Sequence, residues 1–107
     1  MDKGISAGER SNVVVQNNIF KKNEIAIVSK DDSKVLSENN EFINNSVDLA
    51  SFIKKKYFGY PSIDLINSPL QKYLIEEGSL VNGIDSIIYT SNVESKLYGN
   101  LYGRSSD

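Results

Sequence analysis

The 107-residue sequence predicts an all-β solenoid, a coil in which short parallel strands stack on equivalent strands one turn above and below. Two observations predict this fold class. The first is a repeat, because Asn-Asn, one spacer and Phe at residues 17–20 recur at residues 39–42, which is 22 positions later. The second is composition, because asparagine and isoleucine each occur 12 times. Asparagine tolerates tight turns and isoleucine favours strands, so the chain suits many short strands joined by turns.

The repeat also predicts the number of turns. Shifting the sequence by one repeat superposes apolar positions that alternate with a strand period, for example Ile5 on Ile27, Val13 on Val35 and Ile27 on Leu49. A third copy begins at Ile63 after a short insertion near residues 53–61, and a shorter fourth copy includes Val81. We therefore expect about four turns of about three strands each over residues 3–90, in a single domain that spans residues 1–107.

Stacking at about 4.8 Å, the spacing of hydrogen-bonded strands, places repeated side chains in columns. Phe20, Phe42 and Leu70 are expected to form one interior column. Asn18 and Asn40 are expected to stack as an amide ladder inside a bend, each bonding its neighbour and the backbone of the turn. The sequence thus assigns these five residues a structural role.

The last segment departs from the strand pattern. Its apolar residues recur at helical spacing, at Val93, Leu97 and Leu101. Ser91, followed three residues later by Glu94, matches a capping box, and Gly103 matches a helix stop. The sequence therefore predicts a helix over residues 91–103 that covers one open end of the coil.

These features together resemble the right-handed parallel β-helix repeats of the pectate-lyase-like superfamily. The resemblance covers about residues 3–83 and rests on the Asn-Asn-Phe units at 17–23 and 39–45 and on the segments GIS at 4–6 and IAIVSKDDS at 25–33. It implies a right-handed parallel β-helix, a C-terminal segment of a longer protein, and an extracellular or cell-surface location. It is not specific for function, because this fold hosts lyases, hydrolases, epimerases, adhesins and inert scaffolds.

Composition excludes several function classes. The chain has no cysteine and no histidine, which removes disulfides, thiolate chemistry and the commonest general base near neutral pH. A net charge of −2 gives no reason to expect nucleic-acid binding. No apolar run approaches the roughly 18 residues that a membrane span requires.

The insertion is the most individual feature of the sequence and the predicted ligand-binding site. It gathers bases and aromatics on a loop that leaves a regular stack, namely Lys54, Lys55, Lys56, Tyr57 and Tyr60. Lysines can pair with the carboxylates of an acidic polysaccharide, and tyrosines can lie against sugar rings. Strand alternation points Asp48 outward, towards the same groove. The alternative is a solvated turn whose aromatic residues cover the side of the stack.

Acidic residues recur in the turn before the position of Ser11, Ser33 and Ser79, and stacking would bring some of them onto one face, namely Glu9, Asp31, Asp32, Glu76 and Glu77. Asp31 and Asp32 are the candidate calcium ligands, because calcium prefers six to eight oxygen ligands. Lyases of the resembled fold combine such a cluster with a lysine or arginine base, and the nearby bases here are Arg10, Lys30 and Lys34. The alternative is a solvated turn in which Arg10 and Lys30 neutralise the acids.

Two functions follow from these observations. The first is a non-catalytic β-helix segment of a larger protein, a scaffold or carbohydrate-contacting module. The alternative is a polysaccharide lyase-like enzyme that acts on acidic glycans with calcium and a lysine base. In addition, the strand edge of the first turn predicts a homodimer in which two N-terminal ends meet.

Overall fold

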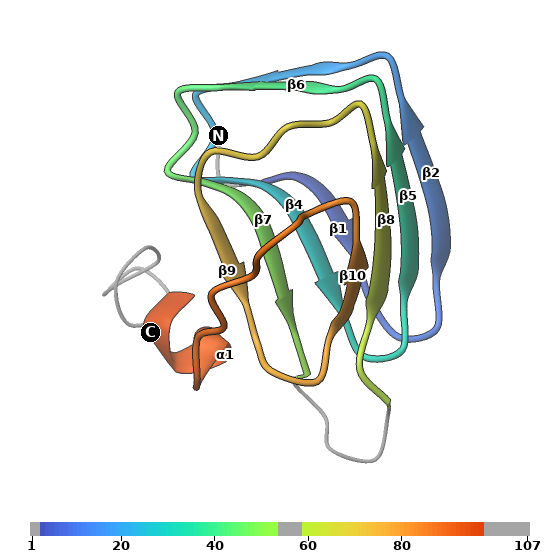
Figure 1. Ribbon diagram of the computed structural model, residues 1–107, viewed down its shortest axis with the longest axis vertical. Coiled ribbons are helices and arrows are strands. Elements are labelled where there is room, and N and C mark those ends of the chain that lie inside the picture. Colours follow the sequence, from blue (N-terminus) through green and yellow to red (C-terminus); the bar gives the residue numbers. More distant parts are fainter. Residues whose placement is uncertain (1–2, 54–58, 98–107) are drawn as a thin grey trace.

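The computed structural model describes residues 3–53 and 59–97, which form a parallel β-solenoid (Figure 1). Its elements in chain order are β1 (Lys3–Ala7), β2 (Asn12–Gln16), β3 (Ile19–Lys21), β4 (Ile25–Lys30), β5 (Lys34–Glu38), β6 (Glu41–Ile43), β7 (Val47–Phe52), β8 (Ser62–Ile66), β9 (Tyr73–Ile75), β10 (Leu80–Asn82) and α1 (Val93–Lys96). Within the described residues the strands form three sheets. Sheet A has the order β1-β4-β7-β9, sheet B has β2-β5-β8-β10, and sheet C has β3-β6.

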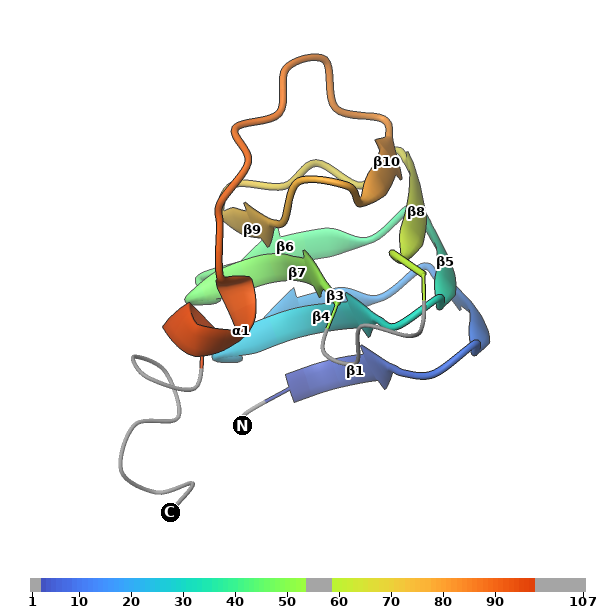
Figure 2. The ribbon, with the colours of Figure 1, turned by 90° about the horizontal axis from the view of Figure 1, so that it is seen from below.

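The strand register confirms the repeat that the sequence predicts. Ile5 pairs with Ile27 and Ile27 with Leu49 in sheet A, and Phe20 pairs with Phe42 in sheet C. Every paired strand runs parallel to its partner, as a coil requires. The successive turns stack from β1 at one end to the segment after β10 at the other (Figure 2), and the coil is right-handed.

Over the described residues the coil has about three turns, where the sequence predicted about four. The third turn is shortened on the sheet C side. Ser37 pairs with Leu65 in sheet B, and Leu49 pairs with Tyr73 in sheet A. Fewer residues separate the pair in sheet A than the pair in sheet B, so the chain that joins β8 to β9 is shorter than the chain that joins β5 to β7. The chain between β8 and β9 is therefore too short to add a third strand to sheet C.

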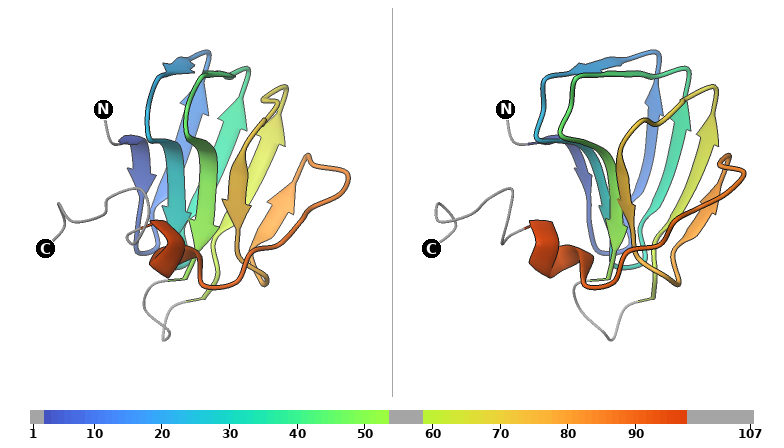
Figure 3. Two further views of the ribbon diagram at one scale, coloured as in Figure 1. Left: turned by 90° about the vertical axis from the view of Figure 1, so that its left-hand side faces the viewer. Right: turned by 60° about the vertical axis from the view of Figure 1, so that its left-hand side comes forward.

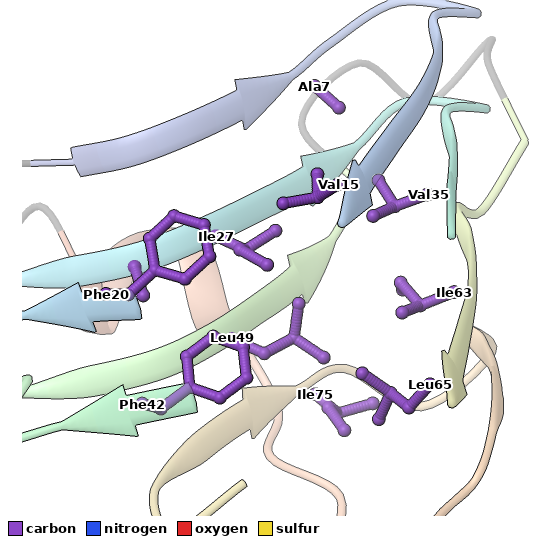
Figure 4. Packing of buried hydrophobic residues seen from close by; sticks show 11 residues of the cluster. Ala7, Val15, Phe20, Ile27, Val35, Phe42, Leu49, Ile63, Leu65 and Ile75 are labelled. Carbon is purple, nitrogen blue, oxygen red and sulfur yellow. The ribbon is translucent and has the colours of Figure 1, made fainter. Parts of the chain in front are cut away.

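The interior of the coil is a column of stacked apolar residues (Figure 4). The rings of Phe20 and Phe42 are stacked with centroids 5.4 Å apart and an interplanar angle of 10°. Ile27 lies over Leu49 in the same interior. Leu70 is only partly buried but packs against this cluster, so the predicted column is confirmed most closely for the two phenylalanines.

A second apolar cluster lies on the outer face of sheet A. Strand β7 is buried along its whole length and β4 along all but its last residue, because α1 covers this face. The cluster comprises Ile25, Val28, Val47, Ala50, Phe52, Val93 and Leu97. Figure 3 shows α1 beside the strands of sheet A rather than over the last turn. The predicted C-terminal helix is therefore present, and it covers the side of the coil instead of the open end.

The start of the helix also differs from the sequence prediction. The N-cap residue is Asn92 in a left-handed conformation, and no side chain caps the helix, so Ser91 and Glu94 form no capping box. Gly103 lies outside the described residues. The apolar spacing, rather than the capping chemistry, identified this helix correctly.

The segment after β10 lies over the last turn of the coil (Figure 2). Ile84 and Ile87 pack against the interior cluster, and Ile75 forms a parallel bridge with Tyr89. In the described part of the chain, no helix has the length and apolarity that crossing a membrane requires.

Candidate functional site

The repeated asparagines hold the bends between the sheets. Asn40 is 1% exposed; its side-chain oxygen accepts a hydrogen bond from the backbone N–H of Asn18 at 2.8 Å. Its amide nitrogen donates to the carbonyl oxygen of Val15 and to the hydroxyl of Ser37, both at 2.8 Å. These contacts are of the kind that the predicted structural role of Asn40 requires. Asn18 itself is exposed, so the ladder joins side chain to backbone rather than amide to amide.

A second bend carries an equivalent ladder that the sequence reasoning did not assign. The side-chain oxygen of Asn45 accepts from the backbone N–H and the side-chain amide of Asn23, at 2.8 and 3.2 Å. The amide of Asn45 donates to the carbonyl oxygen of Phe20. The signal was present in the sequence, because the same repeat distance separates these two asparagines as separates Asn18 from Asn40.

Asp48 belongs to this buried network, and its predicted outward orientation is wrong. It is 2% exposed, and one carboxylate oxygen accepts from the backbone N–H groups of Gln71 and Lys72, at 2.8 and 3.1 Å. The other oxygen accepts from the Asn45 amide at 3.1 Å. Strict alternation fails here because Val47 belongs to the outer cluster and Leu49 to the interior cluster, whereas residues two apart in a regular strand share a face. The carboxylate thus fixes the bend before β9.

The residues predicted to bind calcium lie in the turn between β4 and β5. Asp31 is 1% exposed, and the carboxylate of Asp32 lies 3.7 Å from the Arg10 guanidinium. Both aspartates adopt left-handed backbone conformations in the turn between β4 and β5. Over residues 3–53 and 59–97, no three acidic side chains gather as metal ligands do. The pair of Arg10 and Asp32 agrees with one part of the alternative, in which Arg10 and Lys30 neutralise the acids.

The predicted ligand-binding loop lies partly outside the described residues, since Lys54, Lys55, Lys56 and Tyr57 fall in the segment 54–58. Its C-terminal end is described. Gly59 lies against the carboxylate of Asp32, and the ring of Tyr60 lies directly over Gly78. An added Cβ on Gly78 would meet that ring at 2.7 Å, and Gly78 has a φ of +107°. Glycine is therefore required under Tyr60 for both space and backbone conformation.

Tyr60 forms one wall of a hollow of about 400 Å³ at this corner of the coil. The described lining residues are Tyr60, Glu76, Glu77, Tyr89, Thr90, Ser91 and Asn92. Both tyrosines are partly exposed, at 41% and 48%. The volume falls within the range of about 300–1,000 Å³ that small-molecule sites occupy. The sequence named Tyr60 for the ligand-binding loop and Glu76 and Glu77 for the acidic turns, but it did not bring these residues together. The remaining lining residues were missed as parts of a site, because they lie far from Tyr60 along the chain.

The backbone around the hollow is tied to the sheets. The N–H of Glu76 donates to the carbonyl oxygen of Ser51, and the N–H of Thr90 donates to that of Ile75, at 2.8 and 2.9 Å. A carboxylate oxygen of Glu76 accepts from the N–H of Ile53 at 3.2 Å. The hollow is thus built on strand ends rather than on a loop alone.

A neighbouring hollow of about 450 Å³ lies on the other side of Thr90. Its described lining is Gln71, Lys72, Tyr73, Ile88 and Thr90. The Tyr73 hydroxyl is already engaged there, since it accepts from the N–H of Ile88 at 3.1 Å. This second hollow offers fewer polar groups to a ligand than the one beside Tyr60.

The outer face of sheet B is a further exposed surface. Val14, Ile66 and Leu80 are at least half exposed on it. Polar pairs bridge neighbouring strands on this face, between Gln16 and Glu38 and between Asn82 and Asp64, both at 2.7 Å. Unlike the outer face of sheet A, it carries no helix among the described residues.

Comparison of the chain with models of protein families, with curated proteins and with solved structures found no match. The assignment of a site therefore rests on the geometry alone.

Proposed function

We propose that this chain is a non-catalytic β-helix segment that serves as a scaffold and contacts carbohydrate at the corner beside Tyr60. The observation that carries the proposal is the hollow of about 400 Å³ that Tyr60 and Tyr89 flank. A tyrosine ring offers a flat apolar face to a sugar ring, and its hydroxyl can hydrogen-bond to sugar hydroxyls. Thr90, Ser91 and Asn92 add neutral hydrogen-bonding groups to the same lining.

A non-catalytic role is supported by the positions of the acids that the sequence suggested for metal or ligand binding. Asp31 and Asp48 are buried, and Asp48 accepts hydrogen bonds from two backbone N–H groups. The sequence also contains no histidine or cysteine. The lyase-like alternative gains no support from these groups.

The proposal is tested by measuring binding to a panel of soluble oligosaccharides, with the intrinsic fluorescence of tyrosine as the signal. Tyr60→Ala and Tyr89→Ala are each expected to lower affinity by at least tenfold, while Tyr60→Phe keeps most of it because the ring remains. Ile66→Ala, an exposed change on sheet B, is the control and should bind as the parent does. Absence of binding to every member of the panel would refute the carbohydrate-contacting role.

We also propose that the coil is related to the pectate-lyase-like superfamily and acts at the cell surface or outside the cell. The right-handed parallel coil and its constant register over the first turns support the relationship. Localisation of the tagged protein in the cells that produce it tests the second part, and retention in the cell interior would contradict it.

Finally, we propose that two copies associate through their N-terminal turns. Within the described residues β1, β2 and β3 lie at the edges of their sheets, and an uncovered strand edge is a template for pairing. Light scattering at micromolar concentration is expected to give the mass of a dimer. Val14→Lys, which places a charge on edge strand β2, should shift the mass to that of a monomer, and a monomeric parent would contradict the proposal.

A further inference from the structure

We infer that the hollow beside Tyr60 binds a glycan that carries a protonated amino group, that is, an amino sugar with a free ammonium. This inference rests on the proposed carbohydrate contact and names the class of sugar at that site. It differs from the acidic polysaccharide that the sequence predicted for Lys54–Lys56, which lie outside the described residues.

The first support is the charge of the hollow. Its described lining contains two carboxylates, Glu76 and Glu77, and the described lining residues include no lysine or arginine. Lys72, by contrast, lines the neighbouring hollow. An acidic sugar beside Tyr60 would face like charges, whereas an ammonium gains an attractive interaction with each carboxylate.

The second support is the placement of the aromatic rings. Tyr60 and Tyr89 enter the hollow from two different segments, and a cation within about 6 Å of a tyrosine ring is attracted to the face of that ring. A sugar ring carries its amino group beside hydroxyls and apolar C–H faces. The combination of carboxylates, tyrosines and neutral polar groups therefore matches an amino sugar better than an inorganic cation, for which no third acidic ligand lies nearby in the described residues.

The third support is preorganisation. Tyr60 rests on Gly78, where a side chain would displace the ring. Tyr89 is held by its parallel bridge to Ile75, and one oxygen of Glu76 is oriented by the N–H of Ile53. Groups that are already held in place lose little conformational freedom on binding, which favours affinity.

The test compares oligomers of glucosamine with N-acetylated oligomers of the same length, in titrations monitored by calorimetry. Acetylation removes the positive charge and keeps the sugar ring, so the two probes are matched. The glucosamine oligomer is expected to bind at least tenfold more tightly at low salt, with the difference shrinking as salt rises.

Glu77→Gln is expected to remove most of that difference, and it should leave the fold intact because Glu77 is exposed. Glu94→Gln, an acid on α1 that is not among the described lining residues, is the control and should keep the preference. An unchanged thermal melting curve for Glu77→Gln confirms that any loss is local.

The possible outcomes separate this inference from the proposed function. Equal or tighter binding of the acetylated oligomer would overturn the inference while leaving carbohydrate contact in place. Binding of spermidine with no binding of either oligomer would support a cation site but overturn carbohydrate contact. If neither oligomer nor spermidine bound, both would be wrong.

Discussion

The first two turns of the coil, residues 3–46, differ in regularity from the part that follows them. In the first two turns one repeat distance holds in all three sheets, and equivalent side chains stack directly. In the later part the number of residues between paired positions first rises above this repeat and then falls again. Sheet C has no third strand among the described residues, and α1 packs on the outer face of sheet A instead of continuing the coil. The regular turns form most of the stacked apolar core, whereas the segments that depart from the repeat line the hollow beside Tyr60. The following predictions test this division.

The largest effect is expected in the regular part, at the stacked phenylalanines. Phe42→Ala should lower the free energy of unfolding by about 3–5 kcal/mol, because it truncates a buried aromatic residue and leaves a cavity beside Phe20. Chemical denaturation measures the change. Ile66→Ala, which is half exposed on sheet B, should change stability by no more than about 0.5 kcal/mol. If both variants melted like the parent, the interior column would be assigned incorrectly.

The next prediction tests whether the segment around α1 stabilises sheet A. Leu97→Ala should cost about 2–5 kcal/mol, because Leu97 is buried against the outer face of sheet A. Ser95→Ala, an exposed change on α1, is the matched control and should be neutral or slightly stabilising. A loss limited to the helical signal, with the strands as stable as in the parent, would mean that α1 is dispensable.

The next effect is expected at the asparagine ladder within the first two turns. Asn40→Leu removes the acceptor of the Asn18 N–H and a donor to Ser37, at about 1–3 kcal/mol for each buried group left unsatisfied. Asn18→Ala is the control, because this exposed amide donates only to the carbonyl oxygen of Gln16 among the described contacts. Weaker glycan binding at unchanged stability would move Asn40 from a structural to a functional role.

The smallest effect concerns the insertion. The triple variant Lys54→Glu, Lys55→Glu, Lys56→Glu is expected to lose binding to polymers of uronic acids, at about 0.2–1 kcal/mol for each charge pair, the range typical of protein surfaces. Affinity capture on immobilised polymer at two salt concentrations measures it, and high salt should abolish the difference from the parent. Polymer binding equal to that of the parent would exclude the lysines as a contact.

The sequence alone determined the coil, the parallel register and the columns of Phe20 and Phe42, since a constant period aligns equivalent residues whatever the rest of the chain does. It also marked Asn40 as structural, because a repeated amide in a bend can bond to backbone groups of the neighbouring turn. Apolar spacing was enough to find the helix that begins at Val93.

Only the tertiary structure decided where the helix and the acids lie. Apolar spacing gives a helix a buried face but not the surface it packs on, and the outward-facing apolar residues of β4 and β7 proved to be that surface. Asp48 turned inward because N–H groups at Gln71 and Lys72, in the bend one turn further along the coil, needed an acceptor. The hollow likewise joins Tyr60 to Tyr89 across a turn of irregular length, and no periodic pattern connects two such positions.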